Sequence, residues 1–399
     1  MEKNYSEKLP QGFSMATVEA GFKYRNRPDL ALIFSRSPAV CAGVFTTNTF
    51  QAAPVLIARD NLKKSSTVRA ILVNAGQANA CTGDKGIANC LKTLEIAADK
   101  LQIDSREVLP ASTGVIGDHL KMDLFEKSIP LLVENLGRAR GEDAARAIMT
   151  TDTFPKTAQT EVELEKGKVN FWGMAKGAGM ICPNMATMLG FIFTDLKVEK
   201  SLWQKLTARA VDQSFNALTI DGDTSTNDCV LAMANGESGV ESSGKKDMQM
   251  IEDALNKICR DLSYQIVKDA EGGTKVLQIC VQGAADKAQA KLAASTVGNS
   301  PLVKTAMYGQ DPNWGRIIAA LGRSGAEFDP DKVKVSLAGV EIFSSGCPVD
   351  MDRDSVFASL LKDSDIKIEI DLGKGSGSFN LLASDFTEEY IKINAHYRT

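Results

Sequence analysis

The chain is organised around residues 176–195, which read KGAGMICPNMATMLGFIFTD. A lysine leads a glycine-bearing loop, the loop runs through the turn signal Pro183-Asn184, and a short apolar run bounded by Asp195 follows. Thr187 therefore stands where a turn becomes a buried strand. Taken alone, the position suits a β-branched residue that merely starts a strand. The chemistry available elsewhere in the chain decides whether Thr187 does more.

A threonine nucleophile needs a base, and the sequence restricts the choice. The chain holds two histidines, His119 and His396, and neither lies in a recognisable Ser-His-Asp motif. An α-amine has a pKa of about 7.7–8.0 and lysine one near 10.4, so lowering a lysine by roughly 3 units costs about 4 kcal/mol. An N-terminal threonine carries its own base. Thr187 has an α-amine only if the bond after Ala186 is cut, so we predict self-cleavage between Ala186 and Thr187 together with nucleophilic catalysis.

The segment around Thr187 is one of five motifs that follow one another along the chain. They are residues 72–79 (LVNAGQAN), 110–117 (PASTGVIG), 150–153 (TTDT), 176–189 (KGAGMICPNMATML) and 309–316 (GQDPNWGR). Together they resemble the ornithine acetyltransferases, also called glutamate N-acetyltransferases, of arginine biosynthesis, over nearly the whole chain. The resemblance implies transfer of acetyl from N-acetylornithine to glutamate through an acetyl-threonine intermediate. It implies acetyl-CoA as a further donor in bifunctional members, and neither a metal nor another cofactor.

The resemblance also assigns roles to individual residues. The catalytic residues would be Thr187 and the oxyanion pair Thr113 and Gly114. The substrate-binding residues would be Thr150, Lys176, Thr187, Glu271, Asn394 and Thr399. The residues by themselves leave other interpretations open: a tight turn at 110–117, a solvated Lys176, an exposed carboxylate at a helix end for Glu271, and a frayed chain end after residue 393.

Composition bounds the class of protein. The chain has 399 residues, enough for two or three lobes, and with 44% hydrophobic and 24% charged residues it is typical of globular proteins. A net charge of −4 argues against a nucleic-acid surface. Residues 1–8 are too charged for a secretory signal and no apolar run is long enough to span a bilayer, so we expect a cytoplasmic protein. The eight cysteines show no C-x-x-C spacing, and we expect reduced thiols, with Cys182 no nucleophile.

Hydrophobic periodicity predicts strands and helices in blocks, which favours an α+β fold. Strands are expected at 29–35, 39–46, 54–58, 68–74, 229–233, 275–282, 366–372 and 390–394, with a hairpin over 157–173 and a hairpin turn at 373–378. Helices are expected at 82–101, 123–137, 142–149, 201–214 and 248–269. The resemblance implies an αββα layered sandwich with additional α/β lobes, cut into two chains and assembled as a heterotetramer of two copies of each. The expected parts are 1–186, 187–283 and 284–399.

Other interpretations of the sequence concern a calcium loop and two other classes of function. Residues 221–228 resemble the start of a calcium loop, but Thr226 stands where glycine is needed and Ala232 where the closing glutamate should be, so we expect a polar loop near the site instead. The alternative function is a self-cleaving aminopeptidase or amidohydrolase of the related N-terminal nucleophile group, in which a serine nucleophile is expected. A non-enzymatic binding protein is the third class.

Overall fold

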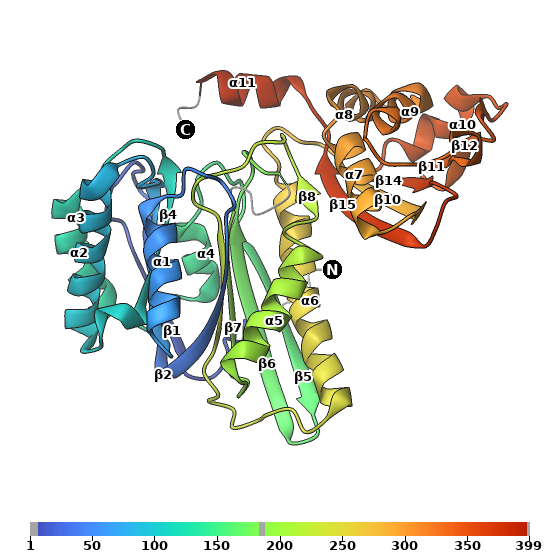
Figure 1. Ribbon diagram of the computed structural model, residues 1–399. Helices are drawn as coiled ribbons and strands as arrows, with labels where there is room; N and C mark the ends of the chain where they lie inside the picture. The colour runs from blue at the N-terminus through green and yellow to red at the C-terminus, as the bar shows by residue number, and fades with distance from the viewer. Residues whose placement is uncertain (1–6, 183–187, 397–399) are drawn as a thin grey trace.

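Two β-sheets packed face to face form the larger part of the molecule, and helices cover their outer faces (Figure 1). The computed structural model describes residues 7–182 and 188–396. Ala186, Thr187 and Thr399, for which functions are predicted above, lie outside the described residues.

The long strand β2 (Leu30–Phe45) belongs to both sheets of the sandwich. Its first part pairs with β1 (Phe13–Val18) and β3 (Val68–Gln77), and β3 pairs in parallel with β4 (Val108–Val115). Its second part pairs with β9 (Cys229–Ala234), and the order continues through β7 (Leu189–Thr194), β6 (Gly167–Lys176) and β5 (Lys156–Leu164). The two strands predicted at 29–35 and 39–46 are therefore one strand, with a register shift between Phe34 and Ala39 where it leaves β3.

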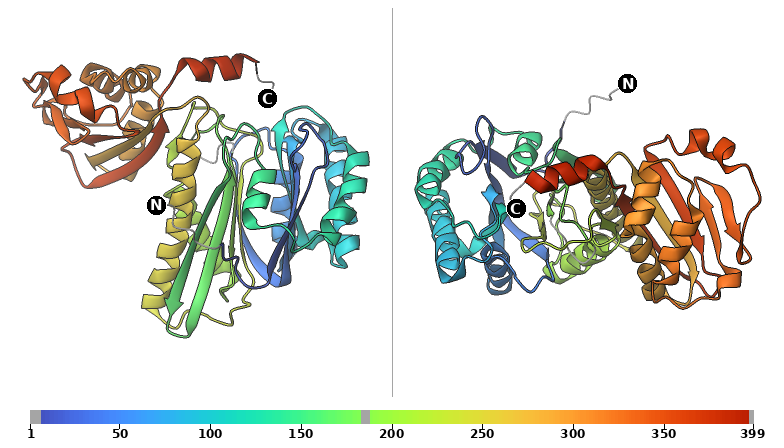
Figure 2. Two further views of the ribbon diagram at one scale, coloured as in Figure 1. Left: turned by 180° about the vertical axis from the view of Figure 1, so that it is seen from behind. Right: turned by 90° about the horizontal axis from the view of Figure 1, so that it is seen from above.

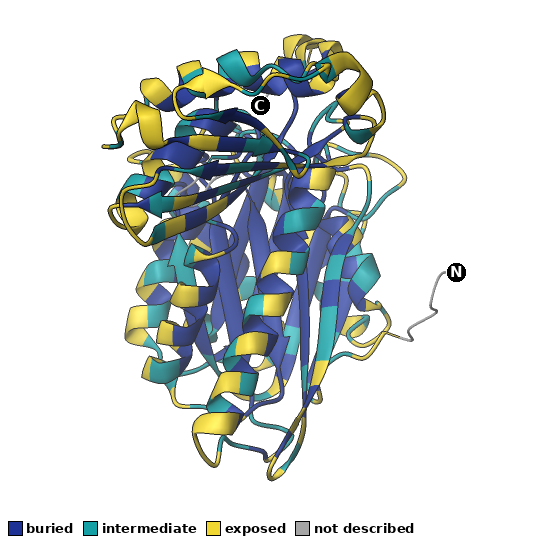
Figure 3. Ribbon diagram, turned by 90° about the vertical axis from the view of Figure 1, so that its right-hand side faces the viewer, coloured by how far each residue is buried: buried dark blue, intermediate teal, exposed yellow. Residues whose placement is uncertain are grey.

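The sandwich has four layers because each sheet is apolar on both faces. Between the sheets, the ring of Phe193 lies 5.2 Å from that of Phe13 and 6.0 Å from that of Trp172. The outer faces pack against α1 (Ala53–Lys64), α2 (Gly83–Leu101) and α3 (Met122–Glu134) on one side and α5 (Lys200–Asp212) and α6 (Lys245–Lys268) on the other, while α4 (Gly141–Ala147) contributes to the core between the sheets. Figure 3 shows the buried strands beneath partly exposed helices. The predicted αββα class is confirmed.

The strand expected at 54–58 is wrong, because this segment begins helix α1. Pro54 lies in the first turn, where its missing N–H costs nothing and its fixed φ suits the helix. The apolar residues that suggested a strand form the buried face of the helix instead. The hairpin expected over 157–173 is present as β5 and β6.

A further, seven-stranded sheet forms a separate lobe beside the sandwich (Figure 1). Its order is β13 (Cys347–Pro348), β12 (Val340–Ser344), β11 (Lys334–Leu337), β14 (Asp365–Asp371), β10 (Val276–Ala284), β15 (Gly377–Ser384) and β8 (Leu218–Thr219). Its α-helices are α7 (Lys287–Gly298), α8 (Pro301–Tyr308), α9 (Trp314–Gly322) and α10 (Arg353–Leu360). A short 3₁₀ helix, η2 (Pro330–Lys332), precedes β11, and another, η1 (Ser105–Glu107), precedes β4 in the sandwich. The turn at 373–378 is not a hairpin turn, since β14 and β15 pair with opposite sides of β10. Turn residues indicate that the chain reverses direction, but they do not show whether a third strand, here β10, lies between the two strands that the turn connects.

The chain ends by returning from this lobe to the sandwich as helix α11 (Glu388–His396), seen from above in Figure 2. The strand predicted at 390–394 is therefore wrong. Thr387 Oγ1 accepts a hydrogen bond from the backbone N–H of Tyr390 at 3.3 Å, and Glu388 and Glu389 occupy the first turn, where negative charge is favourable. These helix-start signals outweigh the alternation of the residues that follow. Among the described helices, none has the length and apolarity needed to cross a membrane.

Candidate active site

A cavity of about 430 Å³ lies where the ends of β4 and β6 meet helix α11. Its lining includes six of the residues predicted for the site: Thr113, Gly114, Thr150, Lys176, Glu271 and Asn394. These residues are as far as 281 positions apart in the sequence, between Thr113 and Asn394. The remaining predicted residues, Ala186, Thr187 and Thr399, fall outside the described part of the chain.

Thr113 and Gly114 lie at the end of strand β4 rather than in a tight turn. They pair in parallel with Ala75 and Gly76 of β3. Gly114 has a φ of +131°, and a Cβ at this position would lie 2.2 Å from the carbonyl carbon of Gly76 and 2.5 Å from the nitrogen of Gln77. Only glycine fits, because both the backbone conformation and the neighbouring strand exclude a side chain. The backbone of Gly114 therefore lines the cavity directly, with no side chain between them.

Lys176 is a buried cation at the end of β6, not a solvated surface lysine. Its side chain is 3% exposed, and its Nζ donates to Thr150 Oγ1 at 2.7 Å and to Thr113 Oγ1 at 3.4 Å. Its Nζ also lies 3.9 Å from the carboxylate oxygen Oδ2 of Asp152. Strand pairing sets Lys176 opposite Leu189, the first residue of β7. The lysine thus faces the start of the strand that follows the predicted nucleophile.

A buried charge network behind Lys176 fixes its position. Asp152 Oδ1 accepts from Lys156 Nζ at 2.7 Å and from the N–H of Gly177 at 2.7 Å, and Lys156 Nζ also donates to Asp269 at 2.5 Å. Burial alone would raise the pKa of Asp152, but the cations of Lys176 and Lys156 outweigh it and hold this pKa well below its usual range. The pattern TTDT included Asp152, yet its pairing with two lysines was not foreseen, because the partners come from two different strands.

The loop at 221–228 is polar and lines the cavity, as expected from its sequence. Asp221 accepts hydrogen bonds from the N–H groups of Met180 and Ile181 at 2.5 and 2.8 Å, and so holds the loop that leads toward residue 187. Burial raises the pKa of Asp221, although these N–H groups offset part of the shift. Tyr390 of α11 donates its hydroxyl to Asp221 at 3.3 Å. Sequence reasoning did not place Tyr390 at this site, because it predicts a strand for residues 390–394, whereas helix α11 brings the hydroxyl to Asp221.

Glu271 closes the cavity from the opposite side and connects three segments. Its backbone N–H donates to the carbonyl of Ala178 at 2.8 Å, and its carboxylate accepts from Asn394 Nδ2 at 2.9 Å. A Cβ on Gly179 would lie 2.4 Å from Glu271 Oε2, so the glycine leaves room for the carboxylate. Glu271 is therefore held between the loop after β6 and the last helix.

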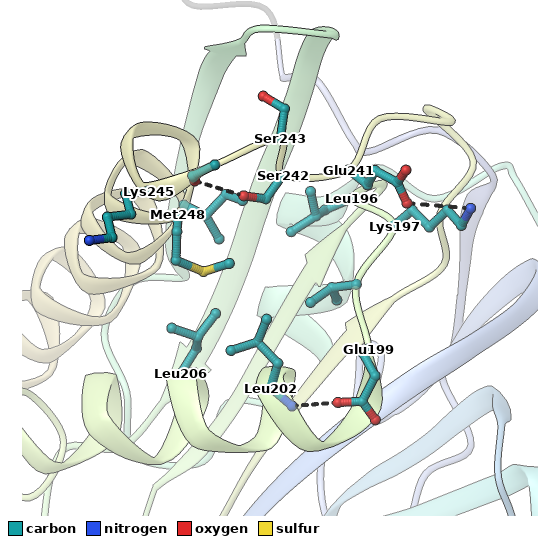
Figure 4. Close-up of a pocket in the computed structure, with 13 residues that line it drawn as sticks. Leu196, Lys197, Glu199, Leu202, Leu206, Glu241, Ser242, Ser243, Lys245 and Met248 are labelled. Atoms are coloured by element: carbon teal, nitrogen blue, oxygen red, sulfur yellow. Dashed lines mark hydrogen bonds and ion pairs between the residues drawn. The ribbon is translucent and has the colours of Figure 1, made fainter.

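A larger hollow of about 730 Å³ lies between α5 and the start of α6 (Figure 4). Leu202, Leu206 and Met248 line it, with Lys197 and Glu241 at its rim. It lies near the hairpin that joins β5 and β6, whereas Lys176 is at the other end of β6. At about 3.3 Å per residue, the length of β6 separates the two by roughly 30 Å. Among the described residues, none of those predicted for the site lines this hollow, so the size of a cavity does not identify the active site.

The four layers, and the cavity at the ends of the central strands, place this chain in the class of αββα-sandwich enzymes. A family model described as the ArgJ family matches residues 14–399, and the chain belongs to this family. The family resemblance deduced from the motifs is thereby confirmed.

Individual relatives support the same assignment. The chain is 53% identical over 390 residues to the arginine biosynthesis bifunctional protein ArgJ of Nitratidesulfovibrio vulgaris, covering 98% of this chain and 99% of the relative. It is 46% identical over 392 residues to the protein of that name from Desulfotalea psychrophila, covering 98% and 99%. The crystal structure of arginine biosynthesis bifunctional protein argJ from Bacillus halodurans matches with a TM-score of 0.51 and 36% identity, covering 53% of this chain and 100% of that one.

Proposed function

We propose that this member of the ArgJ family is a self-processing acetyltransferase, which moves acetyl from N-acetylornithine to glutamate and also accepts acetyl-CoA. The observation that carries the proposal is the position of Lys176. It is buried, it donates to Thr150 and approaches Thr113, and it pairs across the sheet with Leu189. Leu189 comes two residues after Thr187 in the sequence, so its pairing with Lys176 supports a role for this cation and the neighbouring oxyanion pair in the chemistry proposed for Thr187. The word "bifunctional" in the relatives' names supports a second donor.

The proposed reaction proceeds in two half-reactions. The Thr187 hydroxyl attacks the acetamide carbonyl of N-acetylornithine, while its own α-amine takes the hydroxyl proton and returns it to the departing ornithine nitrogen. The negative charge on the carbonyl oxygen is held by Thr113 and the N–H of Gly114. The α-amine of glutamate then attacks the threonine ester, and the hydroxyl of Thr187 regains a proton. No cofactor takes part.

The rest of the cavity is proposed to bind the amino-acid portion of both substrates. A fixed cation such as Lys176, with the Thr150 hydroxyl beside it, suits a carboxylate. Glu271 would accept from a substrate ammonium group, with Asn394 and Thr399 completing the contacts. The cavity thus offers groups of opposite charge on opposite sides, as a zwitterionic ligand requires.

Self-cleavage between Ala186 and Thr187 is part of the proposal. The complete chain of the Bacillus halodurans structure corresponds to about half of this sequence, which supports division into two fragments. We further propose that two copies of each fragment form a heterotetramer in the cytoplasm, with parts at 1–186, 187–283 and 284–399.

Purified protein and two acetyl donors test the proposal. With acetyl-labelled N-acetylornithine and glutamate, mass spectrometry should find the label on glutamate. Label found only in free acetate would indicate a hydrolase, and no reaction would indicate a binding protein. Acetyl-CoA and glutamate without N-acetylornithine test the second donor.

Sequencing of the fragments tests the nucleophile. The second fragment should begin at Thr187. A Thr187→Ala variant should stay uncut and inactive, because it lacks the hydroxyl, whereas Thr187→Ser should cut at least partly. A single full-length chain with full activity would refute the mechanism.

A further inference from the structure

Helix α11 reaches the cavity without packing into a hydrophobic core. It extends from the separate lobe across the end of the sandwich (Figure 2), and its residues Tyr390 and Asn394 line the cavity. All nine residues of α11 are described, and none of them is buried. A helix this short is marginal on its own in water, and a buried apolar face usually supplies the missing stability. The position of α11 therefore depends on individual side-chain contacts.

Tyr390 and Asn394 lie about one turn apart on the same face of α11 and bond to two different segments of the cavity wall. The Tyr390 hydroxyl donates to Asp221 Oδ2 at 3.3 Å. Asn394 Nδ2 donates to Glu271 Oε2 at 2.9 Å and to the Tyr390 carbonyl at 3.1 Å. One carboxyl group thus holds the first turns of the helix and another holds its last turn.

The ring of Tyr390 is held in place from the side of the separate lobe. It lies 4.9 Å from the ring of Phe386, which in turn lies 4.8 Å from Nζ of Lys304 on α8. Lys304 is 1% exposed and donates to the carbonyl and hydroxyl oxygens of Ser384, the last residue of β15. Burial, followed by the charge of Asp221, raises the pKa of the Tyr390 hydroxyl above its usual range, so this hydroxyl keeps its proton and donates.

Asp221 connects this contact to a strained part of the cavity wall. Its two carboxyl oxygens accept hydrogen bonds from the backbone N–H groups of Met180 and Ile181. Met180 lines the cavity and has a φ of +56°, a conformation that residues other than glycine rarely adopt. Such backbone persists where its surroundings hold it. Tyr390 therefore bonds the same carboxyl group that holds the strained turn at Met180.

We propose that Tyr390 is a positioning residue of the substrate site: its hydrogen bond to Asp221 holds α11 over the cavity and so keeps Asn394 in place. Asn394 in turn bonds Glu271, the proposed acceptor for the substrate ammonium group, so this inference rests on the proposed function. Tyr390 acts through Asn394 and not on the reacting carbonyl. The KM for the amino-acid substrate should therefore depend on Tyr390, whereas kcat should not.

Steady-state kinetics of a Tyr390→Phe variant test the proposal. The variant loses only the hydroxyl and keeps the ring that contacts Phe386. A hydrogen bond of 3.3 Å is long, so we take a modest contribution and expect the KM for N-acetylornithine to rise about fivefold, with kcat nearly unchanged. Tyr308→Phe makes the same chemical change on α8, at a residue that is 38% exposed, and should behave like the unaltered enzyme. An unchanged KM in Tyr390→Phe, or a loss confined to kcat, would overturn the proposal.

A double variant separates positioning from direct substrate binding. If Tyr390 acts by keeping Asn394 in place, Tyr390→Phe should raise KM little further in a chain that already carries Asn394→Ala. The same fivefold rise in both backgrounds would show that Tyr390 acts independently of Asn394, and would overturn the proposed route.

Hydrogen exchange of the substrate-free protein reports on α11 without any activity. Amides of residues 388–396 should exchange about fivefold faster in Tyr390→Phe than in the unaltered chain, because the helix opens locally more often. Equal exchange in the two proteins would overturn the holding contact. Faster exchange together with an unaltered enzyme that transfers no acetyl to glutamate would refute the proposed function, while supporting the contact that holds α11.

Discussion

Replacing Asn394 by alanine should weaken substrate binding about tenfold while leaving self-cleavage intact. Asn394 Nδ2 donates to Glu271 Oε2 at 2.9 Å, which joins the last helix to the cavity wall. Helix α11 keeps two other attachments in the variant: Thr387 Oγ1 donates to the Gly272 carbonyl at 2.7 Å, and Tyr390 donates to Asp221. The helix should therefore stay in place, and the loss should be local to Glu271.

The size of the effect follows from the type of hydrogen bond. A hydrogen bond to a charged group typically contributes about 1.5–3 kcal/mol. Asn394 is exposed, so water replaces part of the interaction, and we take the lower end. About 1.5 kcal/mol corresponds to roughly a tenfold change in affinity. A chain that ends after Ile393 loses the same contact and the remaining end of the helix, and should be weakened more.

Steady-state kinetics on the processed enzyme measure the effect. The KM for N-acetylornithine should rise about tenfold and kcat should change much less, because the contact holds Glu271, the proposed acceptor for the substrate ammonium group, and does not touch the reacting carbonyl. Ile391→Ala is the matched control, since Ile391 lies on the same helix and is 68% exposed. If Asn394→Ala keeps the kcat/KM of the unaltered enzyme, the last helix takes no part in substrate binding.

Three further predictions concern the interior. Gly114→Ala should push β4 away from β3 and lower kcat in the acetyl-transfer assay by about 100-fold or more. A near-normal kcat would contradict the oxyanion role of Gly114. Lys156→Met removes the buried cation that bridges Asp152 and Asp269 and should cost about 3–5 kcal/mol, measured by urea unfolding, whereas Lys168→Met removes an exposed pair and should cost less than about 1 kcal/mol. Burial lowers the pKa of Lys304 to about 7, below the unfolded value of 10.5. The unfolded chain therefore binds more protons between pH 7 and 10.5, and this residue makes stability rise with pH across that window. In Lys304→Met, Tm should therefore rise less with pH between pH 7 and 10.5. An unchanged rise of Tm would show that another group, and not Lys304, causes this pH dependence.

The sequence by itself determined the family and the main candidates for the site. The ordered motifs carry this information because each places a residue type suited to the chemistry: a threonine and glycine pair at Thr113 and Gly114, a lysine before a glycine-bearing loop at Lys176, and a threonine at a turn-to-strand junction at Thr187. The long helices α2, α5 and α6 were also predictable, since their apolar residues recur with helical periodicity over many turns.

Tertiary structure decided what short segments become and which distant groups meet. Residues 54–58 and 390–394 have too few residues for periodicity to separate helix from strand, and packing and helix-start contacts settled both as helices. The order of β14, β10 and β15 is a non-local pairing that no local turn signal contains. The same holds for the partners of Asp152, Lys156 and Lys176, which belong to β5 and β6. Each requires separate strands to lie side by side, and only the folded sheets bring them there.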